Sequence, residues 1–383
     1  GKSLAEWMIH GEPEADVYGM DVARYGSWAE NRTYIKQTTG QFYSRRFVMT
    51  YPNEQLPAGR PLKMAPAHDA MTAAGCRWGV SWDLEVPLYF APPEFVEKPT
   101  LKRSNAHDNV AAECAAIRTG AGLLDISGFS RFEVSGPNAT AWLDHLMASK
   151  LPGAGRARLA PMLAETGKLK GDLTVLNWGD GRYWVMGSYY LRAWHMRWFD
   201  AHMPDGVTVR DLGEEVCGFA VIGPKSQAVL AALNPDAAAL PFMGCGRFDI
   251  GLIRAHVARM SVTGETGFEI NCRIGDHIAL RRLLLDAGAS AGIRECGFNA
   301  MLSTRLEKSF GIWSREFTQG YTPAMTGMDR WIDWNKGFVG KAAALAERDG
   351  NGTALSVHVV GAERAARVVA ASPYDPQGRA MRG

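Results

Sequence analysis

Alternating apolar and polar residues predict a β-strand near residue 270. The stretch SVTGETGFEINC (261–272) contains Gly264 and Gly267 and then alternates, with Phe268, Ile270 and Cys272 on one face and Glu269 and Asn271 on the other. Side chains of a strand alternate with a period of two, so the apolar set can face a core while Glu269 points elsewhere. The pattern leaves two alternatives for Glu269, a solvated side chain or one directed at a ligand.

Helical and extended patterns alternate from about residue 105. NVAAECAAIRTG (109–120) predicts a helix that stops at Gly120, LLDISGFSRFEVSGP (123–137) predicts strands with turns, and NATAWLDHLMAS (138–149) predicts another helix. DLTVLNWGDGRYWVMG (172–187) predicts a hairpin that turns at Gly179-Asp180-Gly181. This order of elements predicts an α+β domain with an antiparallel sheet.

One strand–helix unit occurs twice. FEVSGPNATAWLDHL (132–146) and FAVIGPKSQAVLAAL (219–233) both run Phe-x-Val-x-Gly-Pro into a helix with leucines at matching positions. The spacing indicates internally duplicated half-domains.

The two ends of the chain differ in texture from its middle. GKSLAEWMIHG (1–11) predicts a helix ended by Gly11, and APPEFVEKPT (91–100), with three prolines, predicts a linker. We therefore expect three parts: 1–100, 101–345 and 346–383. The N-terminal glycine and the turn-rich ending SPYDPQGRAMRG suggest a piece of a longer polypeptide.

Composition narrows the function classes. A net charge of +2, from 42 basic and 40 acidic residues, gives no footprint for nucleic acid or an anionic membrane, and no apolar run is long enough to span a bilayer. The six cysteines are far apart and lack metal spacing, which predicts a reduced set in a cytoplasmic protein and no metal site. Motifs for a Rossmann turn, a P-loop, a nucleophile elbow or a zinc protease are missing.

Two carboxylates are candidates for chemistry. Asp172, in GKLKGDLTV, is either a turn-flanking group in water or a carboxylate beside a nitrogen that exchanges a proton. Glu269, if ionised, can accept two parallel N–H bonds from a planar donor pair. His195 has the surroundings of a packing residue, and Arg305 and Lys308 are most simply solvated helix charges, with anion capture as the alternative.

Taken together, these motifs resemble the folate-binding aminomethyltransferase family, typified by the glycine-cleavage T-protein. The family pattern GYTGExGxEI resembles SVTGETGFEI (261–270), and its Gly-rich turn followed by Asp-Leu-x-Val resembles GKLKGDLTV (167–175). Arg305-Leu306-Glu307, Thr322-Pro323 and the Phe338–Lys341 strand follow in the family's order. EKSFGIW (307–313) is closer to the dimethylglycine and sarcosine dehydrogenase branch, in which this domain follows a flavin oxidoreductase domain.

The resemblance implies a folate-binding aminomethyltransferase fold preceded by the tail of an FAD-dependent oxidoreductase domain, whose FAD-binding unit would lie before residue 1. The enzyme would oxidise an N-methyl amine, and tetrahydrofolate would capture the iminium as 5,10-methylenetetrahydrofolate. It implies Asp172 as the catalytic carboxylate. The implied folate-binding residues are Glu269, Val262, Thr263, Gly264, Glu265 and Arg305.

The sequence departs from the family at three positions. Gly171 replaces the first of two neighbouring acids, Val262 stands where many members have a tyrosine, and Met301 stands where the T-protein has an arginine. Two alternatives therefore remain: a non-catalytic scaffold that has lost folate binding, and a folate-dependent demethylase of another methyl donor. This chain itself is not expected to hold FAD.

Overall fold

The structure is a computed structural model. It describes residues 1–11, 13, 15–313, 315–350, 357–359, 362–364, 375 and 377–382. About half of the predicted C-terminal part, 346–383, therefore lies outside the described residues.

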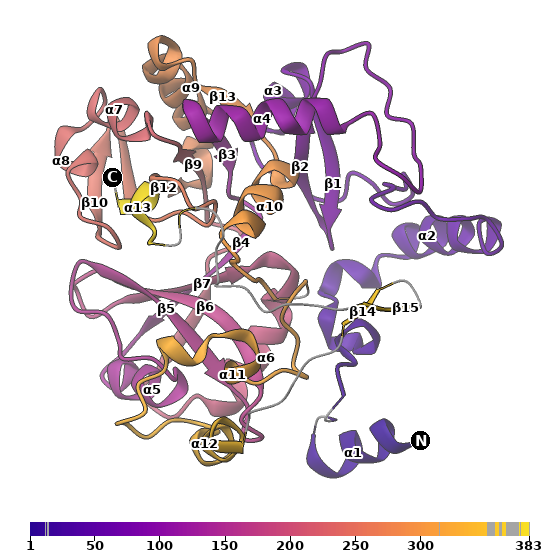
Figure 1. The fold of residues 1–383 in the computed structure, drawn as a ribbon, viewed down its shortest axis with the longest axis vertical. Coiled ribbons are helices and arrows are strands. Elements are labelled where there is room, and N and C mark those ends of the chain that lie inside the picture. The colour runs from indigo at the N-terminus through magenta and orange to yellow at the C-terminus, as the bar shows by residue number, and fades with distance from the viewer. Residues whose placement is uncertain are drawn as a thin grey trace.

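A five-stranded sheet forms the lower half of the body in Figure 1, with the strand order β5-β6-β7-β4-β8 and antiparallel neighbours throughout. Its strands are β4 (Phe129–Ser135), β5 (Arg156–Leu163), β6 (Leu169–Asn177), β7 (Tyr183–Ser188) and β8 (Thr208–Asp211). The predicted hairpin is confirmed: β6 and β7 pair antiparallel, and Gly179 and Gly181 take the positive φ values, 82° and 77°, that its turn requires.

A six-stranded sheet lies above it, with the order β10-β11-β12-β9-β3-β13 (Figure 1). Its strands are β3 (Gly122–Asp125), β9 (Val216–Ile222), β10 (Cys245–Ile250), β11 (Ile253–Ala258), β12 (Gly267–Arg273) and β13 (Arg294–Cys296). β13 pairs parallel with β3, so this sheet is mixed and not purely antiparallel as the sequence predicts. Two small antiparallel pairs complete the strands: β1 (Cys76–Ser81) with β2 (Leu84–Phe90), and β14 (Val357–Val359) with β15 (Ala362–Arg364).

Helices flank the two sheets, and α1 and α2 lie apart from them in the N-terminal region (Figure 1). They are α1 (Lys2–His10), α2 (Arg32–Ser44), α3 (His68–Ala73), α4 (His107–Thr119), α5 (Ala139–Leu146), α6 (Arg192–His202), α7 (Ser226–Ala231), α8 (Pro235–Ala238), α9 (His277–Gly288), α10 (Phe298–Glu307), α11 (Pro323–Thr326), α12 (Lys341–Gly350) and α13 (Arg379–Arg382). The predicted ends at Gly11 and Gly120 are confirmed as the C-caps of α1 and α4. The strand expected at Phe338–Lys341 is wrong, because these residues form a turn that leads into α12. Among the residues described, no helix combines the length and the hydropathy needed to cross a membrane.

The sequence repeat is also a repeat in three dimensions. β4 leads into α5 and β9 leads into α7, and the glycine between them has a φ of 113° at Gly136 and 121° at Gly223. A Cβ atom would lie 2.3 Å from a carbonyl oxygen of Gly206 at the first position and 2.5 Å from one of Gly120 at the second. Both positions therefore require glycine for the same two reasons, and the two copies lie in different sheets.

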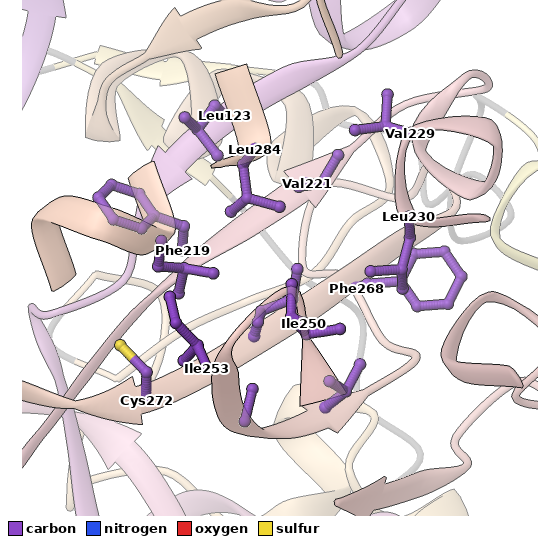
Figure 2. Close-up of a cluster of buried hydrophobic side chains, with 14 of the residues drawn as sticks. Leu123, Phe219, Val221, Val229, Leu230, Ile250, Ile253, Phe268, Cys272 and Leu284 are labelled. Carbon is purple, nitrogen blue, oxygen red and sulfur yellow. The ribbon is translucent and has the colours of Figure 1, made fainter. Parts of the chain in front are cut away.

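The largest core packs against one face of the six-stranded sheet (Figure 2). β12 supplies Phe268, Ile270 and Cys272 to it, as its alternation predicts, and each large side chain buried here contributes about 1.5–3 kcal/mol. The opposite face of β12 is also buried, because Glu269 is 6% and Asn271 0% exposed. The solvated alternative for Glu269 is therefore wrong. All six cysteines are free, as predicted, and five of them are buried.

Candidate functional site

Glu269 is a buried carboxylate with an unsatisfied oxygen. Its Oε2 atom is buried and has no hydrogen-bond partner among the described residues. Burial raises the pKa of Glu269 to about 7, and the nearby charge of Arg131 acts in the opposite direction. A buried acceptor without a donor costs about 1–3 kcal/mol, so this oxygen is suited to a ligand that brings donors.

Glu113 shows what a structural carboxylate looks like in the same fold. It is fully buried on α4, and burial raises its pKa to about 7 as well. Its two oxygens, however, accept the backbone N–H groups of Phe90 at 2.6 Å and Gly297 at 2.9 Å. Glu113 therefore ties β2 and the start of α10 to α4, whereas Oε2 of Glu269 accepts no hydrogen bond from the described residues.

Arg131 joins the two sheets beside Glu269. It is fully buried on β4, and its Nε donates to Oδ1 of Asn271 on β12 at 2.7 Å. Its Nη1 and Nη2 donate to the carbonyl oxygens of Phe129 and Ile126 at 2.8 and 2.9 Å. Arg131 is not among the residues predicted from the sequence, although an arginine inside the strand pattern SRFEV could have pointed to it. Since Asn271 and Glu269 share one face of β12, Arg131 is the buried cation that compensates the charge of Glu269.

We expect Arg131→Met to destabilise the fold by about 3–5 kcal/mol, because it removes three hydrogen bonds and leaves a buried carboxylate uncompensated. The measurement is urea unfolding followed by circular dichroism. Arg254→Met is the control, since Arg254 makes an exposed ion pair with Asp249, and we expect a change within about 0.5 kcal/mol. Equal effects of the two substitutions would contradict the role given to Arg131.

Asp172 lies on β6 and is half-buried, so the alternative of a carboxylate in open water is wrong. Its Oδ2 accepts the backbone N–H of Trp313 at 3.1 Å. Burial raises the pKa of Asp172 to about 7, against the opposing effects of the Trp313 N–H and the charge of Arg305. A carboxyl group that titrates near neutral pH is suited to exchanging a proton at that pH.

The neighbouring glycine explains why a second acid is missing. A Cβ atom at Gly171 would lie 2.9 Å from Nε2 of His195. His195 is fully buried on α6, and burial lowers its pKa to about 3, which keeps the ring neutral. His195 is thus a packing residue, as the sequence predicts, and it leaves no room for an acidic side chain at position 171.

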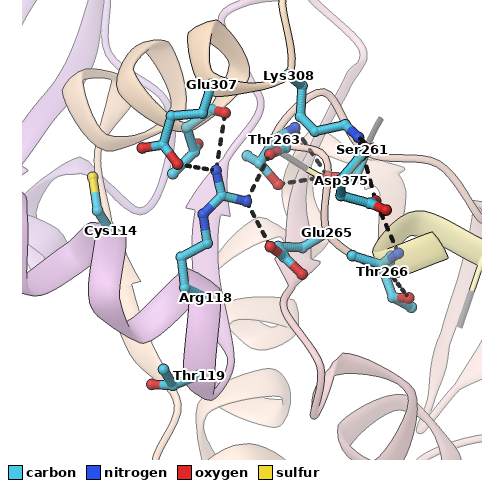
Figure 3. Close-up of polar contacts among 12 residues, drawn as sticks. Cys114, Arg118, Thr119, Ser261, Thr263, Glu265, Thr266, Glu307, Lys308 and Asp375 are labelled. Atoms are coloured by element: carbon cyan, nitrogen blue, oxygen red, sulfur yellow. Dashed lines mark hydrogen bonds and ion pairs between the residues drawn. The ribbon is translucent and has the colours of Figure 1, made fainter. Parts of the chain in front are cut away.

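The polar groups of the glycine-rich loop at 261–267 are used within the protein (Figure 3). Arg118 of α4 donates from Nη1 to the carbonyl oxygen of Thr263 at 3.3 Å and to Oε1 of Glu265 at 2.5 Å. Gly264 has a φ of 85°, and a Cβ there would lie 2.1 Å from the side chain of Lys308. The roles of Thr263, Gly264 and Glu265 as folate contacts remain predictions, and their observed contacts shape the loop.

Arg305 of α10 and Lys308, just after this helix, are not solvated as the sequence predicts. Arg305 is 2% and Lys308 4% exposed, so the prediction of solvated charges is wrong. Lys308 Nζ contacts the backbone carbonyl and, at 3.3 Å, Oδ2 of Asp375. The cause is long-range: later segments of the chain cover helix positions that the local pattern leaves open.

Val262 and Met301, two positions at which the sequence departs from the family pattern, pack together. Met301 is buried in an apolar cluster, and Val262 packs against the same cluster, as do Phe129 and Phe298. Val262 and Met301 therefore contribute apolar packing at the two positions where the resemblance implies a tyrosine and an arginine.

Neither of two surface hollows includes the candidate carboxylates. One lies beside α12 and is lined by Glu165, Phe338 and Lys341 among others, and the other lies between α3 and β13. Glu269 and Asp172 are the candidate site residues because both are desolvated carboxylates with raised pKa values. In the part of the chain that the structure describes, no group of three or more His, Cys, Asp or Glu residues is arranged to hold a metal ion.

Comparison with known proteins agrees with the resemblance seen in the sequence. Residues 67–336 match the GCVT N-terminal domain, and residues 10–65 match the FAD dependent oxidoreductase central domain. These matches leave the predicted boundaries at residues 100 and 345 as predictions.

Individual relatives come from both branches of the family. The mitochondrial dimethylglycine dehydrogenase of Rattus norvegicus is 30% identical over 353 residues, which are 90% of this chain and 41% of that protein. The chain thus spans about two fifths of its length. The aminomethyltransferase of Bacillus subtilis is 31% identical over 250 residues, 64% of this chain and 69% of the relative.

The crystal structure of the glycine cleavage system aminomethyltransferase T from Bartonella henselae shares the fold. Its TM-score is 0.64 at 24% identity, over 76% of this chain and 75% of that one. The predicted fold class and family are confirmed, and the relatives named here are enzymes. The chain belongs to the family of the GCVT aminomethyltransferase domain, which is preceded here by a tail of the FAD dependent oxidoreductase central domain.

Proposed function

We propose that this chain is the folate-dependent part of an enzyme that oxidises an N-methyl amine of the dimethylglycine or sarcosine kind. It would pass the one-carbon unit to tetrahydrofolate and form 5,10-methylenetetrahydrofolate. The observation that carries the proposal is the buried, unpartnered Oε2 of Glu269.

The donor set of a reduced pterin fits this carboxylate. A pterin presents an amide N–H beside an amino group, and an ionised carboxylate accepts such a pair in parallel. Arg131 favours the ionised form of Glu269, and Val262 and Met301 supply apolar contact for a flat ring. Tetrahydrofolate, when bound, supplies the nitrogens that accept the one-carbon unit.

Asp172 would handle the charge of the transfer step. Its Oδ2 is held by the Trp313 N–H, and Oδ1 makes no hydrogen bond to another described residue. As a base it would accept a proton from the attacking nitrogen, and as an anion it would stabilise the developing cation. With a pKa of about 7 it is ionised above neutral pH and protonated below it, so the rate is expected to rise with pH through this value.

The oxidation itself belongs to a flavin domain. The tail at 10–65 is the observation that supports FAD in a longer parent, and we do not assign FAD to this chain. The partners of the proposed reaction are a small-molecule amine and folate. The cytoplasmic location stays a prediction.

Two other functions remain as alternatives. A scaffold that has lost folate binding, or a demethylase of another methyl donor, would fit Val262 and Met301 equally well. The buried acceptor of Glu269 favours a ligand-binding site over a scaffold, because Oε2 destabilises the fold unless a ligand supplies the missing donor.

Trapping of formaldehyde tests the proposal. The full-length parent is supplied with dimethylglycine or sarcosine, and free formaldehyde is measured with and without tetrahydrofolate. We expect that, with tetrahydrofolate present, most of the one-carbon unit appears as 5,10-methylenetetrahydrofolate and little as formaldehyde. Methylenetetrahydrofolate should form faster than in a control with the flavin domain alone, where formaldehyde and tetrahydrofolate react without catalysis. Formaldehyde release that is the same with and without this chain would favour the scaffold.

A further inference from the structure

Arg305 is engaged by the protein on both arms of its guanidinium group. Its Nη1 donates to the carbonyl oxygen of Phe310 at 2.8 Å and to Oε2 of Glu316 at 2.5 Å, and its Nη2 donates to Oε1 of Glu316 at 3.1 Å. This is the paired geometry in which arginine binds a carboxylate most strongly. The Nε atom is buried and has no partner in the described part of the chain.

The pair is charged and only one side of it is open. Partial burial raises the pKa of Glu316, but the hydrogen bond from Arg305 outweighs it and holds the pKa below its usual value. The Glu316 side chain is 39% exposed and that of Arg305 3%. A folate glutamate tail would therefore have to displace a carboxylate that the protein already supplies.

The same pair fixes a short segment, the Trp313 turn (residues 310–313). Phe310 is held through its carbonyl oxygen by Arg305, and the N–H of Ile312 donates to Oε2 of Glu316 at 3.2 Å. The next N–H, that of Trp313, donates to Oδ2 of Asp172 at 3.1 Å. The ring of Trp313 is 3% exposed in an apolar cluster with Phe317 and Phe338, so the end of the turn is anchored as well.

Two hydrogen bonds thus join the ion pair to the Trp313 turn, and a third joins the turn to Asp172, the candidate catalytic carboxylate. We propose that Arg305 is a positioning residue for Asp172 and not a folate ligand: with Glu316 it holds the Trp313 turn, whose amide occupies one oxygen of Asp172 and leaves the other for the folate nitrogen. The inference rests on the proposed function for the role of Asp172. It replaces the folate contact that the resemblance implies for Arg305.

The arrangement also sets the ionisation of Asp172. Burial favours the neutral acid, and the described groups that favour the anion are the Trp313 N–H and the positive charge of Arg305. A loosened Trp313 turn removes the hydrogen bond from the Trp313 N–H. Replacement of Arg305 by a neutral residue removes this hydrogen bond and the positive charge. In either case the pKa of Asp172 should rise, and the carboxylate should be ionised at neutral pH in fewer molecules.

Glu316→Gln tests the proposal in the 383-residue chain, because it keeps the shape and weakens the ion pair at its exposed end. Asp carboxyl carbons are labelled with ¹³C, the Asp172 signal is assigned by its loss in Asp172→Asn, and its titration midpoint is measured. We expect the midpoint to rise by about half a pH unit or more in Arg305→Met, which removes the positive charge and loosens the turn. The rise should be smaller in Glu316→Gln, where Arg305 keeps its charge and the loss of the Glu316 charge acts in the opposite direction. Glu307→Gln is the control, since Glu307 pairs with Arg118 and should leave the midpoint unchanged.

Ligand affinity separates the two roles of Arg305. We expect Glu316→Gln and Arg305→Lys to bind tetrahydrofolate and tail-less tetrahydropterin within about threefold of the wild-type chain. A tenfold loss for tetrahydrofolate alone would make Arg305 a tail ligand and overturn the proposal, as would an Asp172 midpoint that Glu316→Gln and Arg305→Met both leave unchanged. If the wild-type chain binds neither tetrahydrofolate nor tetrahydropterin, the proposed function also fails. The wild-type titration is needed to show this, because a comparison among the variants alone could not.

Discussion

Replacing Asp172 by asparagine should lower the formation of 5,10-methylenetetrahydrofolate in the full-length parent by about 10²–10⁴-fold, the usual worth of a positioned acid or base. Asparagine keeps the shape and loses the charge that would accept a proton. Amine oxidation should continue, because we propose that this chemistry takes place in the flavin domain. Free formaldehyde should therefore rise as methylenetetrahydrofolate falls, and both products can be followed in one assay.

Tetrahydrofolate affinity should change little in this variant, because a group that acts in the transition state affects the rate more than ground-state binding. Asp180→Asn is the matched control. Asp180 lies at the exposed turn of the same hairpin and pairs with Arg247 at 2.7 Å, so its loss should leave the product ratio unchanged. Equal yields of methylenetetrahydrofolate from Asp172→Asn and wild type would show that Asp172 is not catalytic.

The second large effect is expected at Glu269. Removal of a carboxylate that holds two donors should cost about 2–4 kcal/mol of binding, or roughly 30- to 1,000-fold in tetrahydrofolate affinity. Glu269→Ala takes little from the core, because Phe268 and Ile270 pack on the other face of β12. Isothermal titration calorimetry measures the loss of affinity. Because Arg131 loses its compensating negative charge in this variant, circular dichroism is used to check that the variant is folded.

Glu113→Gln provides the contrast for Glu269→Ala. Both carboxyl groups are buried and have raised pKa values, but Glu113 already has two backbone donors. We expect Glu113→Gln to lower the free energy of unfolding and to leave tetrahydrofolate affinity unchanged. If Glu269→Ala bound tetrahydrofolate with wild-type affinity, Glu269 would not be part of the binding site.

Features that depend on local pattern could be predicted from the sequence. The faces of β12 follow from its alternation, the β6–β7 hairpin from Gly179-Asp180-Gly181, and the duplicated unit from two Gly-Pro pairs whose glycines need positive φ. In each case the deciding interactions lie within a few residues along the chain. The parallel pairing of β13 with β3 depends on distant segments and was missed.

The surroundings of the candidate site could not be predicted in the same way. Arg131 and Asn271 are 140 residues apart in the sequence, and Asp172 and Trp313 are 141 apart. The helix pattern TRLEKSFGIW leaves Arg305 on an apparently open face, and only the Trp313 turn and Glu316 bury it. Which carboxylates lie in water, and which are desolvated with raised pKa values, depends on such contacts.

Calorimetric titration of the 383-residue chain with tetrahydrofolate at several pH values tests the central claim most directly. Burial raises the pKa of Glu269 to about 7, so the carboxylate that we propose binds the pterin is ionised above this value and protonated below it. We predict saturable binding at one site at pH 8 and an affinity lower by about 30-fold at pH 5.5, as one ionised group with this pKa requires. No heat of binding at pH 8, with the chain folded, would contradict the claim that this domain is a folate site.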